Sequence, residues 1–213
     1  MDTSRWRRGV AAAAVVAAIG TAGVALPATP ALAASGSASS AAGAASTTTT
    51  PTYDTWVQDV SAVTDTAQSY IAQRTASAGS GEKLAIVLDI DNTALATYFK
   101  GGYPTPATPG VLTLAQYAHA HGVSVFLVTA RPDFIEEVTE YNLDEAGYPV
   151  DGLYGRSLTD LFGEVSAFKT AQRAKIESKG YTIIANVGNN TTDLTGGHAE
   201  QTYKLPDYDG LLD

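Results

Sequence analysis

Apolar residues recur at helical spacing between residues 53 and 76, where Trp56, Val60 and Ile71 share one face and polar residues fill the other positions. This period predicts an amphipathic helix over residues 53–76, which the glycines that follow would end. Three later runs, over residues 83–88, 123–128 and 181–187, are apolar with little or no alternation. Such runs are typical of strands buried on both faces, as in parallel sheets covered by helices.

Helical patterns separate these runs and are followed by Gly122, Gly147 and Gly180, where C-terminal caps are expected. The helices are predicted over residues 111–121, 134–146 and 164–179, and a shorter apolar piece predicts a further strand over residues 152–155. Strands that alternate with helices indicate an α/β fold. We therefore expect a doubly wound, mostly parallel sheet with flanking helices.

The first 33 residues have the order of a secretory signal peptide, with a basic start, an uncharged stretch over residues 9–26 and a small-x-small site that predicts cleavage after Ala33. An uncleaved membrane anchor is the alternative, because the stretch nearly reaches spanning length. Its alanines, valines and glycines are weakly hydrophobic for a permanent span. We expect a secreted protein without a stable membrane anchor.

Residues 34–52 are almost entirely Ala, Ser, Gly and Thr, which cannot form a core, so they predict a linker before one folded domain over residues 53–213. The whole chain has 213 residues, 45% of them hydrophobic, and a net charge of −9. That charge argues against nucleic-acid binding. Cysteine is absent and histidine occurs three times, so carboxylates are the abundant groups for metal binding or catalysis.

Polar residues gather where the predicted strands end, which is where ligands bind in open α/β sheets. They are Asp89 and Asp91 after the first strand, Thr129 after the second, Asn189 and Asp193 after the third, and Lys169 in the helix before it. Two carboxylates two residues apart in extended chain project to one side and repel each other, which favours a bound cation or a raised pKa on one of them. Oxygen ligands of this kind suit Mg²⁺.

These residues resemble the four motifs of the haloacid dehalogenase (HAD) superfamily. Residues 86–93 resemble its first motif, residues 126–129 its second, Lys169 its third and residues 188–193 its fourth. The stretch that follows Phe168 most resembles the branch of class B-like acid phosphatases and plant storage proteins, and the leader suggests an exported bacterial type. The resemblance implies a Rossmann-like HAD fold. The short segments between the motifs leave no room for a large cap domain.

The resemblance implies hydrolysis of phosphate monoesters through an aspartyl-phosphate. Asp89 would be the nucleophile and Asp91 the general acid and base, while Thr129 and Lys169 would bind the phosphoryl oxygens. An open site without a cap suits small phosphorylated substrates, so the sequence indicates a secreted acid phosphatase. A non-catalytic phospho-ligand-binding or storage protein is the alternative. A receiver-type signalling domain is disfavoured, because a receiver gathers its acids before the phosphorylated aspartate.

The same resemblance implies a Mg²⁺ site formed by Asp89, Asp91, Asp193 and Asn189. Relatives usually carry aspartate where this chain has Asn189. An asparagine oxygen can ligate a hard cation but brings no charge, so we expect weaker Mg²⁺ binding, and tighter binding in Asn189→Asp. The roles of two neighbours stay open: Arg131 contacts either substrate or an acid such as Asp133, and the Tyr98-Phe99 pair either stacks on a leaving group or packs in the core.

Overall fold

A computed structural model describes residues 50–212; the predicted signal peptide and almost all of the predicted linker lie outside the described residues. The sheet has five strands in the order β3-β2-β1-β4-β5, and all pairs of neighbours are parallel. The strands are β1 (Lys83–Leu88), β2 (Ser124–Pro132), β3 (Gly152–Arg156), β4 (Tyr181–Gly188) and β5 (Gln201–Lys204). The predicted α/β fold with a parallel sheet is confirmed.

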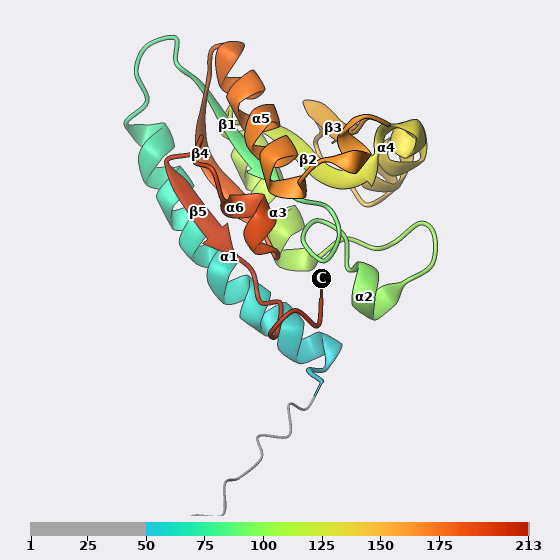
Figure 1. The fold of residues 1–213 in the computed structure, drawn as a ribbon. Coiled ribbons are helices and arrows are strands. Elements are labelled where there is room, and N and C mark those ends of the chain that lie inside the picture. The colour runs from blue at the N-terminus through green and yellow to red at the C-terminus, as the bar shows by residue number, and fades with distance from the viewer. Residues whose placement is uncertain (1–49, 213) are drawn as a thin grey trace, which may run out of the picture. The chain divides into compact units, whose positions relative to one another are not determined.

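Helices connect the strands and cover both faces of the sheet (Figure 1). They are α1 (Tyr53–Ala76), α2 (Thr97–Lys100), α3 (Pro109–Ala120), α4 (Glu136–Glu145), α5 (Val165–Ser178) and α6 (Thr191–Leu194), with short 3₁₀ turns at Asp133–Ile135 and Asp160–Phe162. Helix α1 has the predicted bounds, and the Thr52 hydroxyl caps it by accepting a hydrogen bond from the Thr55 main-chain N–H at 3.1 Å. Within residues 50–212 the connections are short, and no separate cap domain interrupts them.

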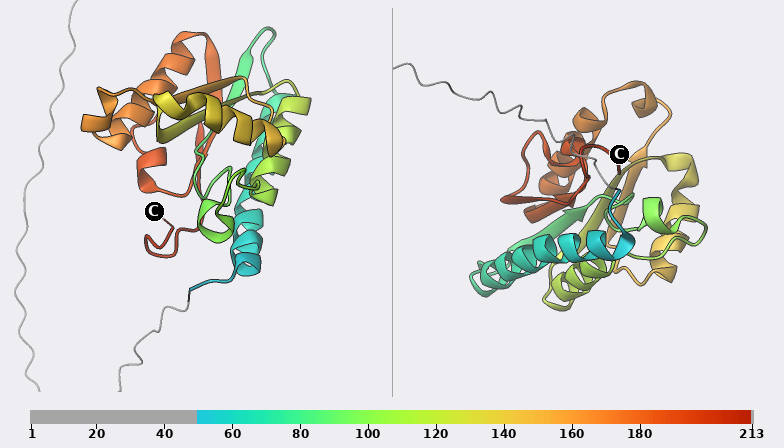
Figure 2. Two further views of the ribbon diagram at one scale, coloured as in Figure 1. Left: turned by 90° about the vertical axis from the view of Figure 1, so that its right-hand side faces the viewer. Right: turned by 90° about the horizontal axis from the view of Figure 1, so that it is seen from below.

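The unbroken apolar run of β1 is explained by two cores, one on each side of the sheet. Ile86 and Leu88 belong to the larger core, which α1 and α3 complete, whereas Ala85 and Val87 belong to the smaller one beneath α5. Figure 2 shows α1 and α3 together on one side and α5 on the other. Because both faces of the sheet are covered, the strand has no solvent-exposed face for alternate polar residues, and its sequence is continuously hydrophobic.

The edge strand β5 is absent from the sequence prediction. It has four residues, and three of them, Gln201, Thr202 and Lys204, are exposed. A short polar strand at the edge of a sheet carries no hydrophobic run that would reveal it. The short helices α2 and α6 were likewise not predicted. No helix within residues 50–212 has the length and hydropathy needed to cross a bilayer.

Candidate active site

The site lies where the strand order reverses. β1 pairs with β2 on one side and with β4 on the other, so the loops after β1 and β4 diverge at their carboxyl ends. Asp89 follows β1 directly, and its main-chain N–H donates to the Val187 carbonyl of β4 at 3.0 Å. An open pocket of about 410 Å³ lies beyond this point. The sheet therefore fixes the Asp89 backbone at the mouth of the crevice.

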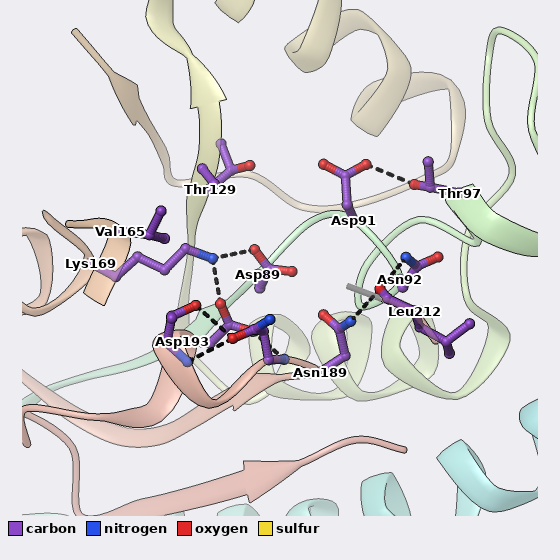
Figure 3. Close-up of a pocket in the computed structure, with 13 residues that line it drawn as sticks. Asp89, Asp91, Asn92, Thr97, Thr129, Val165, Lys169, Asn189, Asp193 and Leu212 are labelled. Carbon is purple, nitrogen blue, oxygen red and sulfur yellow. Dashed lines mark hydrogen bonds and ion pairs between the residues drawn. The ribbon is translucent and has the colours of Figure 1, made fainter. Parts of the chain in front are cut away.

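Lys169, in the second turn of α5, reaches into this pocket and contacts two carboxylates. Its Nζ donates to Asp89 Oδ1 and to Asp193 Oδ1, both at 2.5 Å, and all three side chains are less than one-tenth exposed (Figure 3). Two buried carboxylates thus share one ammonium. The second oxygen of Asp89 points away from Lys169 (Figure 3).

Burial and charge set the pKa values of this cluster. The pKa of Asp89 is raised to about 6, mainly by burial; Lys169 opposes the rise, and the charges of Asp193 and Asp91 contribute to it. Burial lowers the pKa of Lys169, but the two carboxylates outweigh it, so its pKa is raised overall. Lys169 is therefore a permanent cation, and Asp89 is ionised above about pH 6.

Asp91 lies two residues after Asp89 and is held by a separate set of partners. Arg131 binds its carboxylate with two hydrogen bonds, from Nε at 2.9 Å and from Nη2 at 2.7 Å, and the Thr97 hydroxyl donates to it at 2.8 Å. Burial favours the neutral acid, but Arg131 and Thr97 outweigh it, so the pKa of Asp91 is lowered. Of the two roles left open for Arg131, the structure shows an ion pair, and its partner is Asp91 rather than Asp133.

Thr129 stands on β2 beside Lys169 and Asp89 (Figure 3). Its hydroxyl accepts a hydrogen bond from the Arg131 main-chain N–H at 3.2 Å, and the residue is buried.

The two aromatic residues of α2, Tyr98 and Phe99, have different environments. Phe99 packs on Trp56 at a ring-centroid distance of 5.0 Å, whereas Tyr98 is 46% exposed. Core packing therefore accounts for Phe99 alone.

Asp193 is positioned by the loop that follows β4. Its Oδ2 accepts the Asn190 main-chain N–H at 2.8 Å, and this contact forms half of the capping box of α6. A Cβ at Gly188 would lie 2.3 Å from Asp193 Oδ2, so only glycine leaves room for this carboxylate. Arg173, fully buried one turn after Lys169, donates to the Asp193 carbonyl at 2.7 Å. Both carboxylate oxygens of Asp193 therefore accept hydrogen bonds within the protein, Oδ1 from Lys169 and Oδ2 from Asn190.

Asn189 faces the pocket from the other side of this loop. Its Oδ1 accepts a hydrogen bond from the Thr93 hydroxyl at 3.2 Å, and its Nδ2 donates to the Leu212 carbonyl at 3.0 Å. The amide oxygen lies on the side of Asp89 (Figure 3). Within residues 50–212 no three His, Asp or Glu side chains group as a metal site would require. A cation here would therefore use Asp89 together with neutral oxygens such as that of Asn189.

All six residues that the sequence placed at the site line one pocket: Asp89, Asp91, Thr129, Lys169, Asn189 and Asp193. The sequence reasoning missed Thr97 and Leu212, which also line it. Thr97 lies in a short helix without periodicity. Leu212 takes part through its main-chain carbonyl, for which no residue type is diagnostic.

Burial predicts that the ionised Asp89 carboxylate costs stability in the metal-free protein. Its pKa is about 6 when folded and near 3.8 as an ordinary aspartate, so the folded state holds its proton more tightly. Its stabilising effect is therefore present below about pH 4 and lost as the pH rises through 6. Between pH 4 and pH 7.5 we expect the free energy of unfolding of the wild type to fall by about 2 to 3 kcal/mol relative to that of Asp89→Asn. Urea unfolding of both proteins in EDTA measures this, and parallel pH curves would contradict it.

Comparison with known proteins places this site in a family. The family model described as "HAD superfamily, subfamily IIIB (Acid phosphatase)" matches residues 100–211, slightly more than half of the chain. The match includes Thr129, Lys169, Asn189 and Asp193, while Asp89 and Asp91 precede it.

Curated relatives agree with this family. The stem 28 kDa glycoprotein of Glycine max is 32% identical over 105 residues, which are 47% of this chain and 41% of that protein. Acid phosphatase 1 of Solanum lycopersicum is 31% identical over 103 residues, 47% of this chain and 40% of that protein. The chain thus spans about two fifths of the length of these relatives.

A solved structure has the same fold. The class C acid phosphatase from Bacillus anthracis superposes with a TM-score of 0.55 at 21% identity, over 74% of this chain and 85% of that one. Its tungstate-bound form gives a TM-score of 0.57 at 20% identity, over 75% and 83% of the two chains. At this identity the likeness shows the fold alone. Because the family match covers more than half of the sequence, the chain belongs to subfamily IIIB of the HAD superfamily, the acid phosphatases.

Proposed function

We propose that this protein is a secreted, magnesium-dependent phosphomonoesterase that hydrolyses small phosphate monoesters through an aspartyl-phosphate. The observation that carries the proposal is the contact between Asp89 and Lys169 beside the Thr129 hydroxyl, at the carboxyl ends of the central strands. A carboxylate nucleophile, a cation and a hydroxyl donor in one open pocket are the groups that phosphoryl transfer to an aspartate needs. The acid phosphatase family supports the reaction class.

The Asp89 oxygen that points away from Lys169 would attack phosphorus, and the bond from phosphorus to the leaving oxygen would break. The pKa of Asp91 is lowered, so Asp91 would first take up a proton from solvent, which the negative charge of a bound phosphate favours. It would give this proton to the leaving oxygen and later take one from the water that hydrolyses the aspartyl-phosphate. The second step releases phosphate and restores both carboxyl groups. Lys169 and Thr129 would donate hydrogen bonds to the transferring oxygens, where negative charge spreads in the transition state.

The charge of the site supports a divalent cation as the cofactor. Asp89 and Asp193 share the Lys169 ammonium, and among residues 50–212 the carboxylates that line the pocket outnumber its one lining cation before a phosphate dianion enters. The Asp89 carboxylate, the Asn189 side-chain oxygen and the Asp91 main-chain carbonyl would hold the ion. When bound, it would supply positive charge that neutralises the phosphoryl oxygens. Asp193 already accepts hydrogen bonds from Lys169 and from the Asn190 main chain, so it would position Lys169 and would meet the metal directly or through water.

Arg131 would orient the general acid. Its two hydrogen bonds fix the Asp91 carboxyl plane at the rim of the pocket. Loss of Arg131 would raise the pKa of Asp91 and favour its protonated form, but it would also leave the carboxyl group unoriented. We expect the loss of orientation to dominate, so that Arg131→Leu slows hydrolysis of alkyl phosphates by about 10- to 100-fold, because a poor leaving group depends on a well-placed proton from Asp91. Aryl phosphates with good leaving groups should slow much less. Ratios of kcat/KM for the two substrate classes measure this, with Arg74→Leu, which breaks ion pairs to Glu82 and Glu200, as the control. An equal loss on both classes would contradict the assignment.

The direct test of the proposed function is phosphate release from 4-nitrophenyl phosphate. We expect the wild type to turn over in Mg²⁺, to lose activity in EDTA, and to recover when Mg²⁺ is restored. A homologous fold has been solved with tungstate, a tetrahedral oxyanion, so tungstate binding provides a second readout. Tungstate binding without turnover would favour the alternative of a non-catalytic phospho-ligand-binding protein, and the match to "Vegetative storage protein 1" of Arabidopsis thaliana gives that alternative its support.

A further inference from the structure

Residues 205–212 return from β5 to the active site and are fastened along their length. The Leu205 main-chain N–H donates to the Gly188 carbonyl at 2.8 Å, and the Tyr208 hydroxyl donates to Asp59 on α1 at 2.7 Å. The side chains of Leu205 and Leu212 are buried in the larger core. These contacts hold the segment against the body of the protein at its start, its middle and its end.

The turn within this segment has an unusual backbone. Tyr208, Asp209 and Gly210 have φ angles of 52°, 59° and 84°, in the left-handed region. Tyrosine and aspartate adopt this region rarely, and such residues persist where the surrounding structure fixes them. Here the turn reverses the chain and brings Leu212 to the pocket that Asp89 and Asn189 line.

At the end of the segment one main-chain carbonyl bridges two loops of the site. The Leu212 oxygen accepts the side-chain N–H of Asn92 at 2.7 Å and that of Asn189 at 3.0 Å (Figure 3). Asn92 belongs to the loop after β1, where its own φ is 55° and its Oδ1 accepts the Tyr98 main-chain N–H at 2.7 Å. Asn189 belongs to the loop after β4. The carbonyl thus ties together the two loops that carry Asp89 and the proposed metal-facing amide.

An amide has one oxygen and one nitrogen end, so a partner for the nitrogen decides where the oxygen points. The Leu212 carbonyl can accept a hydrogen bond but cannot donate one. Together with the Thr93 hydroxyl, which donates to Oδ1 at 3.2 Å, it selects the orientation in which Asn189 Nδ2 faces Leu212 and Oδ1 lies on the side of Asp89 (Figure 3). An aspartate at this position would set a carboxylate oxygen against the Leu212 oxygen, and two acceptors at that distance repel each other.

We propose that residues 205–212 are a positioning segment for the metal site, in which the Leu212 carbonyl orients Asn189 and matches the site to asparagine rather than aspartate. The inference rests on the proposed function of this pocket. It also changes the expectation from sequence that Asn189→Asp simply tightens Mg²⁺ binding. The added charge would attract the cation, but the variant would lose a hydrogen bond and gain repulsion at Leu212.

The test is a double-mutant cycle read by titration calorimetry of Mg²⁺ binding, which needs no turnover. The four proteins are the full chain and the chain ending at Gly210, each with asparagine or with the Asn189→Asp change. We expect Asn189→Asp to tighten Mg²⁺ binding by less than about threefold in the full chain, but by about tenfold or more in the shortened chain. Equal tightening in both backgrounds, or tenfold tightening in the full chain, would overturn the proposal.

The wild-type full chain gives a second measurement that stands even where the shortened chain does not fold. Without metal, the side-chain amide protons of Asn92 and Asn189 should exchange with solvent much more slowly in NMR spectra than those of exposed Gln201. Exchange of the Asn189 amide as fast as that of Gln201 would overturn the proposal. If the wild type hydrolyses 4-nitrophenyl phosphate but the double-mutant cycle shows no coupling between Asn189→Asp and the end of the chain, the positioning segment alone is rejected. Coupling without hydrolysis would reject the proposed reaction alone.

Discussion

Asp89→Asn is expected to abolish phosphate release, with a fall in kcat of about 10⁴-fold or more. The amide is nearly the same size as the carboxylate, but it cannot form the aspartyl-phosphate on which both steps of the proposed reaction depend. The structure also predicts that the variant folds. Removing one of the two carboxylates that share Lys169 removes the cost of burying a carboxylate charge and does not break the packing.

Steady-state assays with 4-nitrophenyl phosphate at saturating Mg²⁺ measure this effect, and circular dichroism confirms the fold of the variant. Asp144→Asn is the matched control, because Asp144 is an exposed aspartate on α4 outside the residues that line the pocket. It should retain wild-type kcat. A second readout is the transfer of ³²P from a labelled phosphate monoester to the protein. After acid quenching, the wild type should carry the label and Asp89→Asn should not. An active Asp89→Asn would exclude Asp89 as the nucleophile.

The sequence predicted the part of the fold that burial controls. The runs that became β1 and β4 are continuously apolar because helices cover both faces of the sheet, and the glycines after α3, α4 and α5 marked where those helices end. β5 was missed because an exposed edge strand can be polar. The predicted helix over residues 134–146 begins two residues later, at Glu136, since a 3₁₀ turn precedes it.

The sequence also placed six residues at the site but could not assign their partners. Arg131 has an acid two residues away, Asp133, yet it binds Asp91, which is 40 residues distant in sequence. The side-by-side pairing of β1 and β2 makes this contact, and pairing is not visible in either strand alone. Asp193 is predicted to serve the metal site, but its contacts with Lys169 and Asn190 become apparent only when α5 and α6 are placed. The Leu212 carbonyl carries no signature in sequence at all.

Lys169→Met is expected to damage both activity and stability, and the two effects should separate. Lys169 would bind the transferring oxygens, so its loss should lower kcat/KM by about 10³-fold. It is also the shared cation of two buried carboxylates, and removing one partner of a buried ion pair costs about 3 to 5 kcal/mol. Lys175→Met, on the exposed side of the same helix, is the matched control for both measurements.

The double variant Lys169→Met with Asp193→Asn distinguishes the two roles of this lysine. It removes one of the two carboxylates left without a cation, so urea unfolding should show that part of the lost stability returns. The catalytic loss should remain, because no ammonium is restored to the phosphoryl oxygens. If turnover recovered together with stability, Lys169 would act on the reaction only by keeping the pocket folded. Stability without turnover would instead support a direct role for the Lys169 ammonium in the reaction, beside Asp89, to which it donates at 2.5 Å.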